Sequence, residues 1–136
     1  MIAYVGAVDG VCTHGLAISL SDVQENNATF AEATGDVISS WATNNPVPGG
    51  IWRIPSEKDW QYMMWGYYAD SPLPTNISDF QTKLGSVGLA LANDKYYWTS
   101  TEDTYQAKTV YYDGIFAGIP STTKTQTWRV RACLAF

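Results

Sequence analysis

The sequence predicts a single α+β domain over residues 1–136, with two to three helices packed on a small antiparallel sheet. Three observations indicate this class. Apolar residues at helical spacing occupy the first two thirds of the chain, and strand-like alternation occupies most of the last third. A further strand-like pair stands at the start. Because the apolar C-terminal segment needs a partner, we expect it to pair with the N-terminal strands and bring the two termini together.

The first third should form a strand pair followed by a helix. Ile2–Val5 is typical of a strand, and the alternation over Leu16–Leu20 makes that segment its expected partner. The run Thr29-Phe30-Ala31-Glu32 is a capping box, which predicts a helix start. This helix should end near residues 44–46. Its apolar stripe is expected to comprise Phe30, Ala33, Val37 and Trp41.

Two further helices are expected before residue 88. Ser56 is placed to cap the first of them, with Glu57 and Asp59 favourably located in its opening turn. Ile77–Leu84 predicts a third, shorter helix that ends at Gly85. The core-facing stripe of the Ser56 helix is expected to comprise Trp60, Met63, Met64 and Tyr67.

The last third should supply the strands of the sheet. Tyr96–Ser100 predicts one strand, and Asp113-Gly114 predicts a tight hairpin between Thr109–Tyr112 and Ile115–Ala117. From residue 128 onward every second residue is apolar, which is typical of a strand with one buried face. These residues are Trp128, Val130, Ala132, Leu134 and Phe136.

The composition favours a binding surface and argues against nucleic acid and membrane insertion. Aromatic residues make up 14% of the chain, more than a core of this size needs, so some rings should be exposed for contact. The net charge is -5 and the 8 Lys and Arg are scattered, so no basic cluster is available for phosphates. No apolar run reaches the roughly 20 residues of a membrane span. Met1 leads directly into a strand rather than a signal peptide, so we expect an excised domain or a protein exported by another route.

Residues that carry enzyme chemistry are sparse, which favours a noncatalytic domain without cofactor or metal. His14 is the only histidine, and we expect it to be structural or solvent-exposed. The adjacent acids Glu102 and Asp103 are expected as solvated residues at a strand end rather than as an acid–base pair. Cys12 and Cys133 fit no zinc motif, and we expect buried free thiols, with a bond between the two left open.

Three segments match known motifs in their order along the chain. They are W-R-I-P-S-E-K-D-W at residues 52–60, Y-W-T-S-T-E at residues 97–102, and R-V-R-A-C-L-A-F at residues 129–136. Together they resemble Bacteroidetes surface proteins and related domains with a C-type-lectin-like fold. The start of the chain, A-Y-V-G at residues 3–6, is similar as well. The resemblance implies this fold for the whole chain, with Trp52, Trp60 and Met64 in the scaffold core.

The last two segments are most similar to the variable proteins of diversity-generating retroelements, found in phages and gut bacteria. In that family, codons near the C-terminus are randomised at adenines, and the fold holds the encoded side chains on one exposed ligand-binding face. Residues 115–123 consist entirely of types that such codons yield. The apolar run 116–120 is expected in an exposed position, which indicates a contact site, the alternative being that Ile115 and Ile119 pack inward. The implied ligand-binding residues are Asp103, Thr104, Tyr105, Tyr112, Asp113, Ile115, Ala117, Ile119, Ser121 and Thr123, framed by Trp98 and Trp128.

The resemblance implies a noncatalytic domain that binds an unknown protein or glycan, outside the cytoplasm on a bacterial surface or a phage virion. The alternative in the same class is a pilus-tip or lipoprotein adhesin module without hypervariation. A remote alternative is an enzyme, because formylglycine-generating enzymes share the broad fold, but Cys12 and Cys133 lie in the wrong segments for that chemistry. The Glu-Pro-Asn and Gln-Pro-Asp triplets of calcium-dependent lectins are absent from the sequence.

Overall fold

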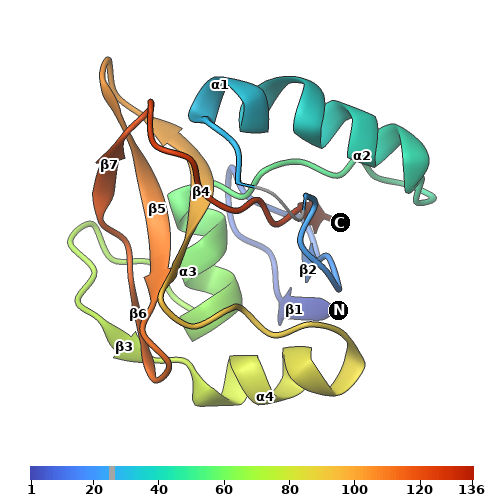
Figure 1. The fold of residues 1–136 in the computed structure, drawn as a ribbon. Helices are drawn as coiled ribbons and strands as arrows, with labels where there is room; N and C mark the ends of the chain where they lie inside the picture. Colours follow the sequence, from blue (N-terminus) through green and yellow to red (C-terminus); the bar gives the residue numbers. More distant parts are fainter. Residues whose placement is uncertain (25–26) are drawn as a thin grey trace.

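The structure is a computed structural model that describes residues 1–24 and 27–136. Its helices and antiparallel strands confirm the α+β class (Figure 1). The strands form two separate sheets, and one helix, α3 (Glu57–Trp65), contacts strands of both. Within the described part of the chain, no helix is long and apolar enough to cross a membrane.

The smaller sheet joins the two ends of the chain. Strand β1 (Ile2–Val5) pairs antiparallel with β2 (Gly15–Ile18), and β2 pairs antiparallel with β8 (Cys133–Ala135). The Met1 ammonium donates a hydrogen bond to the Ile18 carbonyl at 2.8 Å. The expected pairing of the N- and C-terminal strands is therefore confirmed, and both termini lie at this sheet (Figure 1).

The larger sheet carries the strands of the last third. Strand β4 (Lys95–Glu102) pairs antiparallel with β5 (Gln106–Tyr112). The other edge of β5 is shared, because β6 (Phe116–Gly118) pairs with its last residues and β7 (Ser121–Thr123) pairs with its first residues. The two-residue strand β3 (Thr75–Asn76) pairs with β6. The predicted strand and hairpin of this region are confirmed.

The C-terminal segment forms less strand than its alternation predicts, since β8 covers only Cys133–Ala135. Before it, residues 128 and 129 make isolated bridges to Ala28 and Tyr97. Arg131 is 1% exposed and lies between the buried Val130 and Ala132, so the predicted polar face is also covered. The segment is thus packed on both sides, which simple alternation does not reveal.

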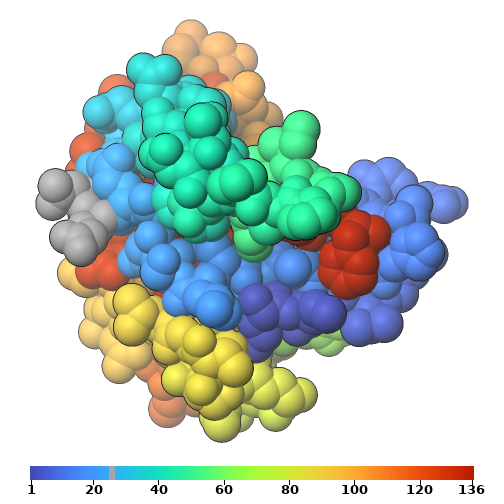
Figure 2. All heavy atoms as spheres, turned by 90° about the vertical axis from the view of Figure 1, so that its right-hand side faces the viewer, coloured from blue at the N-terminus to red at the C-terminus, as the bar shows by residue number. Residues whose placement is uncertain are grey.

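The first helix begins as predicted and is then bent. Thr29 caps α1 (Phe30–Glu32) through a capping box with Glu32. A π-helical turn over Ala33–Val37 follows, and α2 (Ile38–Asn44) completes the element. Gly35 has φ -101° and ψ -115°, which is not helical, so it is the site of the bend. Figure 2 shows α2, in teal, on the side of the molecule where the C-terminal residues, in red, lie against the N-terminal strands.

The second and third helices are confirmed, with two corrections. Ser56 caps α3, and its hydroxyl accepts a hydrogen bond from the Asp59 amide at 3.1 Å. Gly66 ends α3 with φ 78°, so Tyr67 lies beyond the helix and is 50% exposed instead of completing the stripe. Helix α4 (Ser78–Val87) runs through Gly85 and ends at Gly88.

The apolar core consists of two clusters, one on each face of the larger sheet. The larger cluster lies between both sheets and helices α3 and α4, and it includes the predicted core residues Trp60 and Met64. The smaller cluster lies under α1 and is centred on Trp98, whose ring meets Phe30 edge-on at 5.5 Å. Trp52 is only half-buried and belongs to neither cluster, so its predicted core role is wrong.

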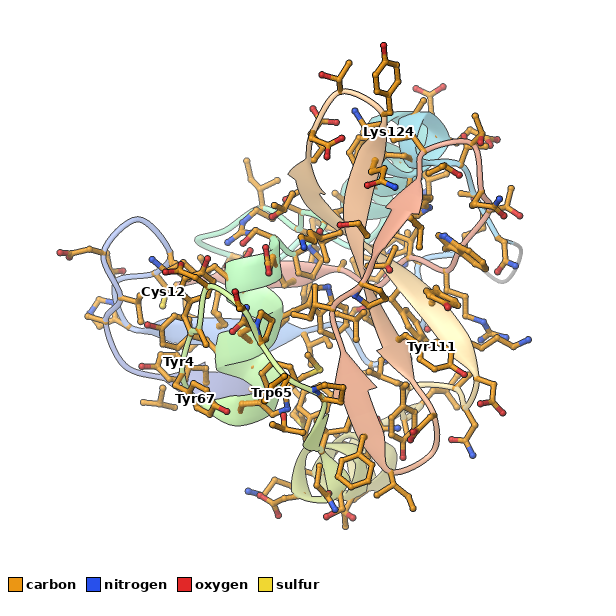
Figure 3. All side chains as sticks on the ribbon, turned by 90° about the vertical axis from the view of Figure 1, so that its left-hand side faces the viewer. Tyr4, Cys12, Trp65, Tyr67, Tyr111 and Lys124 are labelled. Carbon is orange, nitrogen blue, oxygen red and sulfur yellow. The ribbon has the colours of Figure 1, made fainter. Side chains whose placement is uncertain are left out.

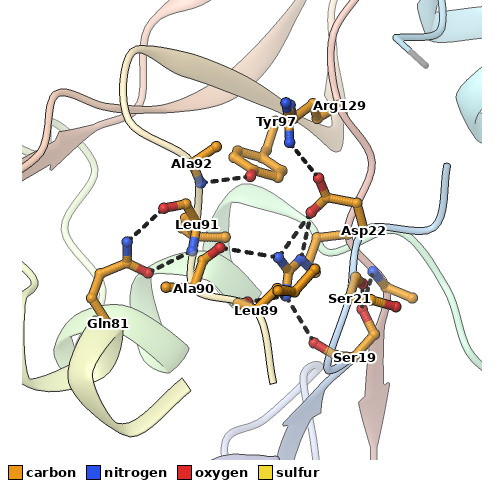
Figure 4. Close-up of polar contacts among 12 residues, drawn as sticks. Ser19, Ser21, Asp22, Gln81, Leu89, Ala90, Leu91, Ala92, Tyr97 and Arg129 are labelled. Atoms are coloured by element: carbon orange, nitrogen blue, oxygen red, sulfur yellow. Dashed lines mark hydrogen bonds and ion pairs between the residues drawn. The ribbon is translucent and has the colours of Figure 1, made fainter. Parts of the chain in front are cut away.

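A buried polar network joins the C-terminal segment to the segment that precedes β4 (Figure 4). The Arg131 guanidinium contacts the Asp22 carboxylate at 2.8 Å and donates to the carbonyls of Ser19 and Leu89 at 3.1 and 2.9 Å. Arg129 donates to the same carboxylate at 2.8 Å. Both guanidinium groups share the Asp22 carboxylate, so the network fixes the loop at residue 89 with its charges matched, although Nε of Arg129 is buried without a hydrogen-bond partner among the described residues.

Candidate functional site

The predicted binding residues divide into an exposed set and a buried set. Exposed residues occupy two turns at opposite ends of β5, a strand of 7 residues and about 20 Å in length. The first turn, at the end next to β7, exposes Asp103, Thr104 and Tyr105, and the neighbouring strand β7 exposes Ser121 and Thr123. The second turn, next to β6, exposes Asp113, Ile115 and Phe116.

Both turns are held by a carboxylate rather than by the side chains they display. One oxygen of Asp103 accepts hydrogen bonds from the amides of Tyr105 and Gln106 at 3.0 and 2.8 Å. These backbone donors lower the pKa of Asp103, so it stays ionised at neutral pH. The Tyr105 side chain is 80% exposed and takes no part in the cap.

Asp113 repeats the arrangement in the second turn. One of its oxygens accepts hydrogen bonds from the amides of Ile115 and Phe116 at 2.9 and 2.8 Å. These donors lower the pKa of Asp113 in the same way. Ile115 is 55% exposed. The Ile115 side chain is therefore displayed by the second turn and takes no part in holding the backbone.

Four predicted site residues are core residues and cannot contact a ligand. Tyr112, Ala117 and Ile119 belong to the larger core cluster. Tyr112 and Ala117 are cross-strand partners and share the inward face of the sheet. Trp98 is buried beneath Phe30, and its Nε1 donates to the Ala28 carbonyl at 2.7 Å. Ile119 therefore packs inward, as the alternative interpretation of the apolar run held, whereas Ile115 is exposed.

A row of three aromatic side chains crosses the sheet face opposite α3, which we call the outer face. Tyr96 and Tyr111 are cross-strand partners whose ring centroids lie 4.6 Å apart. Trp128 stacks on Tyr96 at 4.3 Å and donates from Nε1 to the Thr122 hydroxyl at 3.0 Å. Trp128 therefore does lie at the candidate face, as predicted. Tyr96 and Tyr111 were missed, although the alternation of β5 places Tyr111 opposite to Tyr112.

Beside Tyr111 the outer face is hollowed into a groove of about 430 Å³, which we call the Tyr111 groove. Its walls include Tyr111, Phe116 and Pro74, and Asp113 stands at its rim. Gly118 forms part of its floor, opposite Tyr111 in the strand register. Figure 3 shows Tyr111 on the sheet, well separated from Lys124 at the first turn.

Acidic side chains dominate the electrostatics around Tyr111. Its hydroxyl donates to Asp94 Oδ1 at 3.0 Å. This hydrogen bond, together with the charges of Asp94 and Asp113, raises the pKa of Tyr111. Among the described residues, no Lys or Arg lines the Tyr111 groove. The neutral phenol is therefore the form present at physiological pH, and the groove has a negative rim.

A larger groove of about 660 Å³ lies between α2 and residues 46–54. Its lining is mainly apolar and includes Ile38, Ile51 and Trp52. Trp52 donates from Nε1 to the Asn45 carbonyl at 3.0 Å and meets Trp41 edge-on at 5.3 Å. The sequence did not predict this groove, because Trp52 was expected in the core.

Of the groups capable of acid–base or thiol chemistry, the Cys133 thiol lies 4.0 Å from the Asp59 carboxylate, and that carboxylate is already paired with Arg53. His14 is exposed, with Thr13 as its neighbour at 3.1 Å. Cys12 and Cys133 are free thiols; Cys133 is buried, which raises its pKa, and Cys12 is half-buried. Among the described residues, no group of three or more His, Cys, Asp or Glu side chains could hold a metal ion.

Comparison of the chain with protein-family models and with curated proteins gave no match. The exposed turns, the aromatic row and the grooves are therefore the features of the molecule that bear on its function.

Proposed function

We propose that this chain is a noncatalytic ligand-binding domain of the C-type-lectin-like fold. Its binding surface comprises the two exposed turns and the aromatic row between them. The observation that carries the proposal is that side chains in both turns are displayed on backbones fixed by Asp103 and Asp113. Such preorganised turns lose little conformational entropy on binding, which favours affinity.

The rest of the surface supports this assignment. The ring faces of Tyr96, Tyr111 and Trp128 offer rigid contact area at low entropic cost. Lys124 stabilises the first turn because its ammonium pairs with Glu102 at 3.0 Å. The partner class is a cell-surface protein or glycan, and the site of action is outside the cytoplasm. These assignments follow from the resemblance of the three sequence motifs.

We further propose that the exposed turn residues vary in the manner of diversity-generating retroelement proteins. Two observations support this proposal. Residues 115–123 consist of types that randomised codons yield, and the exposed residues of the turns are distinct from the buried residues of the core. Sequencing of this gene from many isolates, with its neighbourhood, tests the proposal. We expect a reverse transcriptase gene, a near-identical template copy, and differences at codons 104, 105 and 115, with the turn caps Asp103 and Asp113 retained and no differences at codons 112, 117 or 119. Without a template copy, the adhesin without hypervariation replaces this proposal.

Binding itself is tested on arrays of glycans and cell-surface proteins. The variant Tyr105→Ser/Ile115→Ser removes one displayed apolar side chain from each turn and leaves both turn caps intact. The control Val5→Ser removes an apolar side chain that is 78% exposed on β1. We expect the double variant to lose binding to targets that the wild type and Val5→Ser retain. Equal binding by all three proteins excludes the turns as the binding surface.

A further inference from the structure

The Tyr111 groove combines an aromatic wall, an open floor and a negative rim. Tyr111 and Phe116 provide ring surface, and Gly118 leaves the space between Tyr111 and Pro74 unfilled. A Cβ atom added at Gly118 would lie 3.5 Å from Pro74 Cγ, which is ordinary contact distance. The backbone there therefore tolerates a side chain, and glycine leaves the groove open.

Two carboxylates with unused acceptor capacity lie beside Tyr111: Asp113 lines the groove, and Asp94 accepts the hydrogen bond of the Tyr111 hydroxyl. The structure assigns hydrogen bonds to Oδ1 of Asp113, from Ile115 and Phe116, and to Oδ1 of Asp94, from Tyr111. The second oxygen of each carboxylate receives no hydrogen bond from the described residues. A carboxylate can accept further charge-assisted hydrogen bonds at its second oxygen.

No basic side chain neutralises this rim. The ion pairs found among the described residues leave Asp94 and Asp113 without a cationic partner. Lys95 follows Asp94 but shares the register position of Tyr112, so it lies on the opposite face of the sheet from Tyr111. A cation entering the groove would thus meet two carboxylates and aromatic rings with little competing positive charge.

We propose that the Tyr111 groove binds an arginine side chain presented by an extended segment of a protein partner. The planar guanidinium stacks on the Tyr111 ring while its N–H groups donate to Asp113 and Asp94. The proposal rests on the proposed ligand-binding function and names the partner chemistry for one end of that surface.

Arginine suits this site better than the other candidate occupants. Its guanidinium is planar, so it can stack on a ring and present several N–H donors to carboxylates at once. A lysine ammonium forms a cation–π contact but is more strongly hydrated and lacks the planar donor set. A neutral apolar segment would fill the groove without using either of the two exposed carboxylates. An acidic glycan would be repelled by the rim.

The binding test uses acetyl-Gly-Arg-Gly-amide as the probe, with the Lys and Gln peptides of the same length for comparison. Amide chemical shifts of the ¹⁵N-labelled full chain are followed during titration to about 10 mM peptide, the range suited to weak contacts. We expect saturable shifts at residues 111–118 for the Arg peptide, weaker shifts for Lys, and none for Gln. Affinity should fall as salt is added, because the contact is charge-assisted.

Matched variants separate the charge from the fold. Asp113→Asn removes one charge and keeps an amide oxygen that can cap the same pair of backbone amides. We expect Asp113→Asn to weaken Arg peptide binding at least about tenfold, the loss typical of a charge-assisted hydrogen bond. Asp9→Asn removes one charge from the exposed loop between β1 and β2, outside the proposed binding surface, and should leave binding unchanged. Gly118→Val should abolish binding by filling the floor, with an unaltered circular dichroism spectrum.

Three outcomes overturn the inference: no shifts with the Arg peptide, equal shifts with the Gln peptide, or equal weakening by both Asn variants. The array experiment with Tyr105→Ser/Ile115→Ser tests the proposed function separately. If array binding depends on those residues while the Arg peptide fails, the domain binds a ligand but the Tyr111 groove does not take arginine. If the double variant instead binds the arrays as well as the wild type does, the proposed function fails.

Discussion

The guanidinium of Arg131 and the carboxylate of Asp22 lie 2.8 Å apart, although 109 residues separate them in the sequence. Arg131 is 1% exposed and Asp22 is 13% exposed, so solvent screens the pair little. The contact ties the C-terminal segment to the segment that follows β2. Removing the carboxylate would leave a buried guanidinium held only by backbone carbonyls.

We therefore predict that Asp22→Ala lowers the free energy of unfolding by about 3 kcal/mol, the low end for breaking a buried ion pair. Urea denaturation followed by tryptophan fluorescence measures it. The control is Asp79→Asn, which breaks the exposed pair between Asp79 and Lys83 in α4. That change should stay within about 0.5 kcal/mol. A loss below about 1 kcal/mol in Asp22→Ala would contradict the prediction.

Two isoleucines of the apolar stretch should respond oppositely to truncation. Ile119 is 8% exposed in the core, whereas Ile115 is 55% exposed in the second turn. Ile119→Ala should cost about 2–5 kcal/mol because it removes buried apolar volume. Ile115→Ala should change stability by less than about 0.5 kcal/mol. The same denaturation experiment compares them, and similar losses would show that the turn side chain is also packed.

The two thiols should differ in reactivity toward a disulfide reagent. Burial raises the pKa of Cys133, so its thiol stays protonated and inaccessible in the folded protein. Cys12 is half-buried, and its Sγ contacts the Gly6 carbonyl at 3.3 Å. At pH 8 we expect Cys12 to react with dithionitrobenzoate in the native protein and Cys133 only after unfolding. Cys12→Ser should then abolish the native reaction, and a surviving reaction would place Cys133 at the surface.

Acid should weaken the cap of the first helix. The Thr29 amide and hydroxyl lower the pKa of Glu32 below its usual 4.5, because they donate to the ionised carboxylate. The folded state thus favours the charged form, and this stabilisation is present above pH 4.5 and lost as pH falls through the lowered pKa. Glu32→Gln should be less stable than wild type at pH 7, and the gap should close toward pH 2. Urea midpoints measure this, and a gap independent of pH would contradict it.

Local signals in the sequence were sufficient to predict where the first two helices begin. The capping boxes at Thr29 and Ser56 depend on residues three positions apart, so the sequence alone predicts them. Helix ends were less certain, because α4 continues through Gly85 to Gly88. A helix continues through a glycine when packing elsewhere outweighs its entropic cost.

The candidate face was harder to predict because successive side chains of a strand point to opposite faces, so the exact position of each residue decides its face. Tyr111 and Tyr112 are adjacent, yet one lies on the outer face and the other in the core. If the predicted position of a strand is wrong by one residue, every side chain is assigned to the wrong face. Trp98 shares the face of Tyr96 but is covered by Phe30, a contact between residues far apart in the sequence. Only the tertiary structure shows which half of that face is open.

The arrangement of the terminal strands has a mechanical consequence. Met1 lies beside Ile18, at one end of β2, while the amide and carbonyl of Phe136 bond to Gly15 at the other end. Because β1 and β8 both run antiparallel to β2, a force applied to the two ends would pull them in opposite directions along it. The hydrogen bonds on both sides of β2 would be loaded together in shear rather than opened one at a time. A tether through both ends would thus strain the small sheet first and leave the larger sheet unloaded.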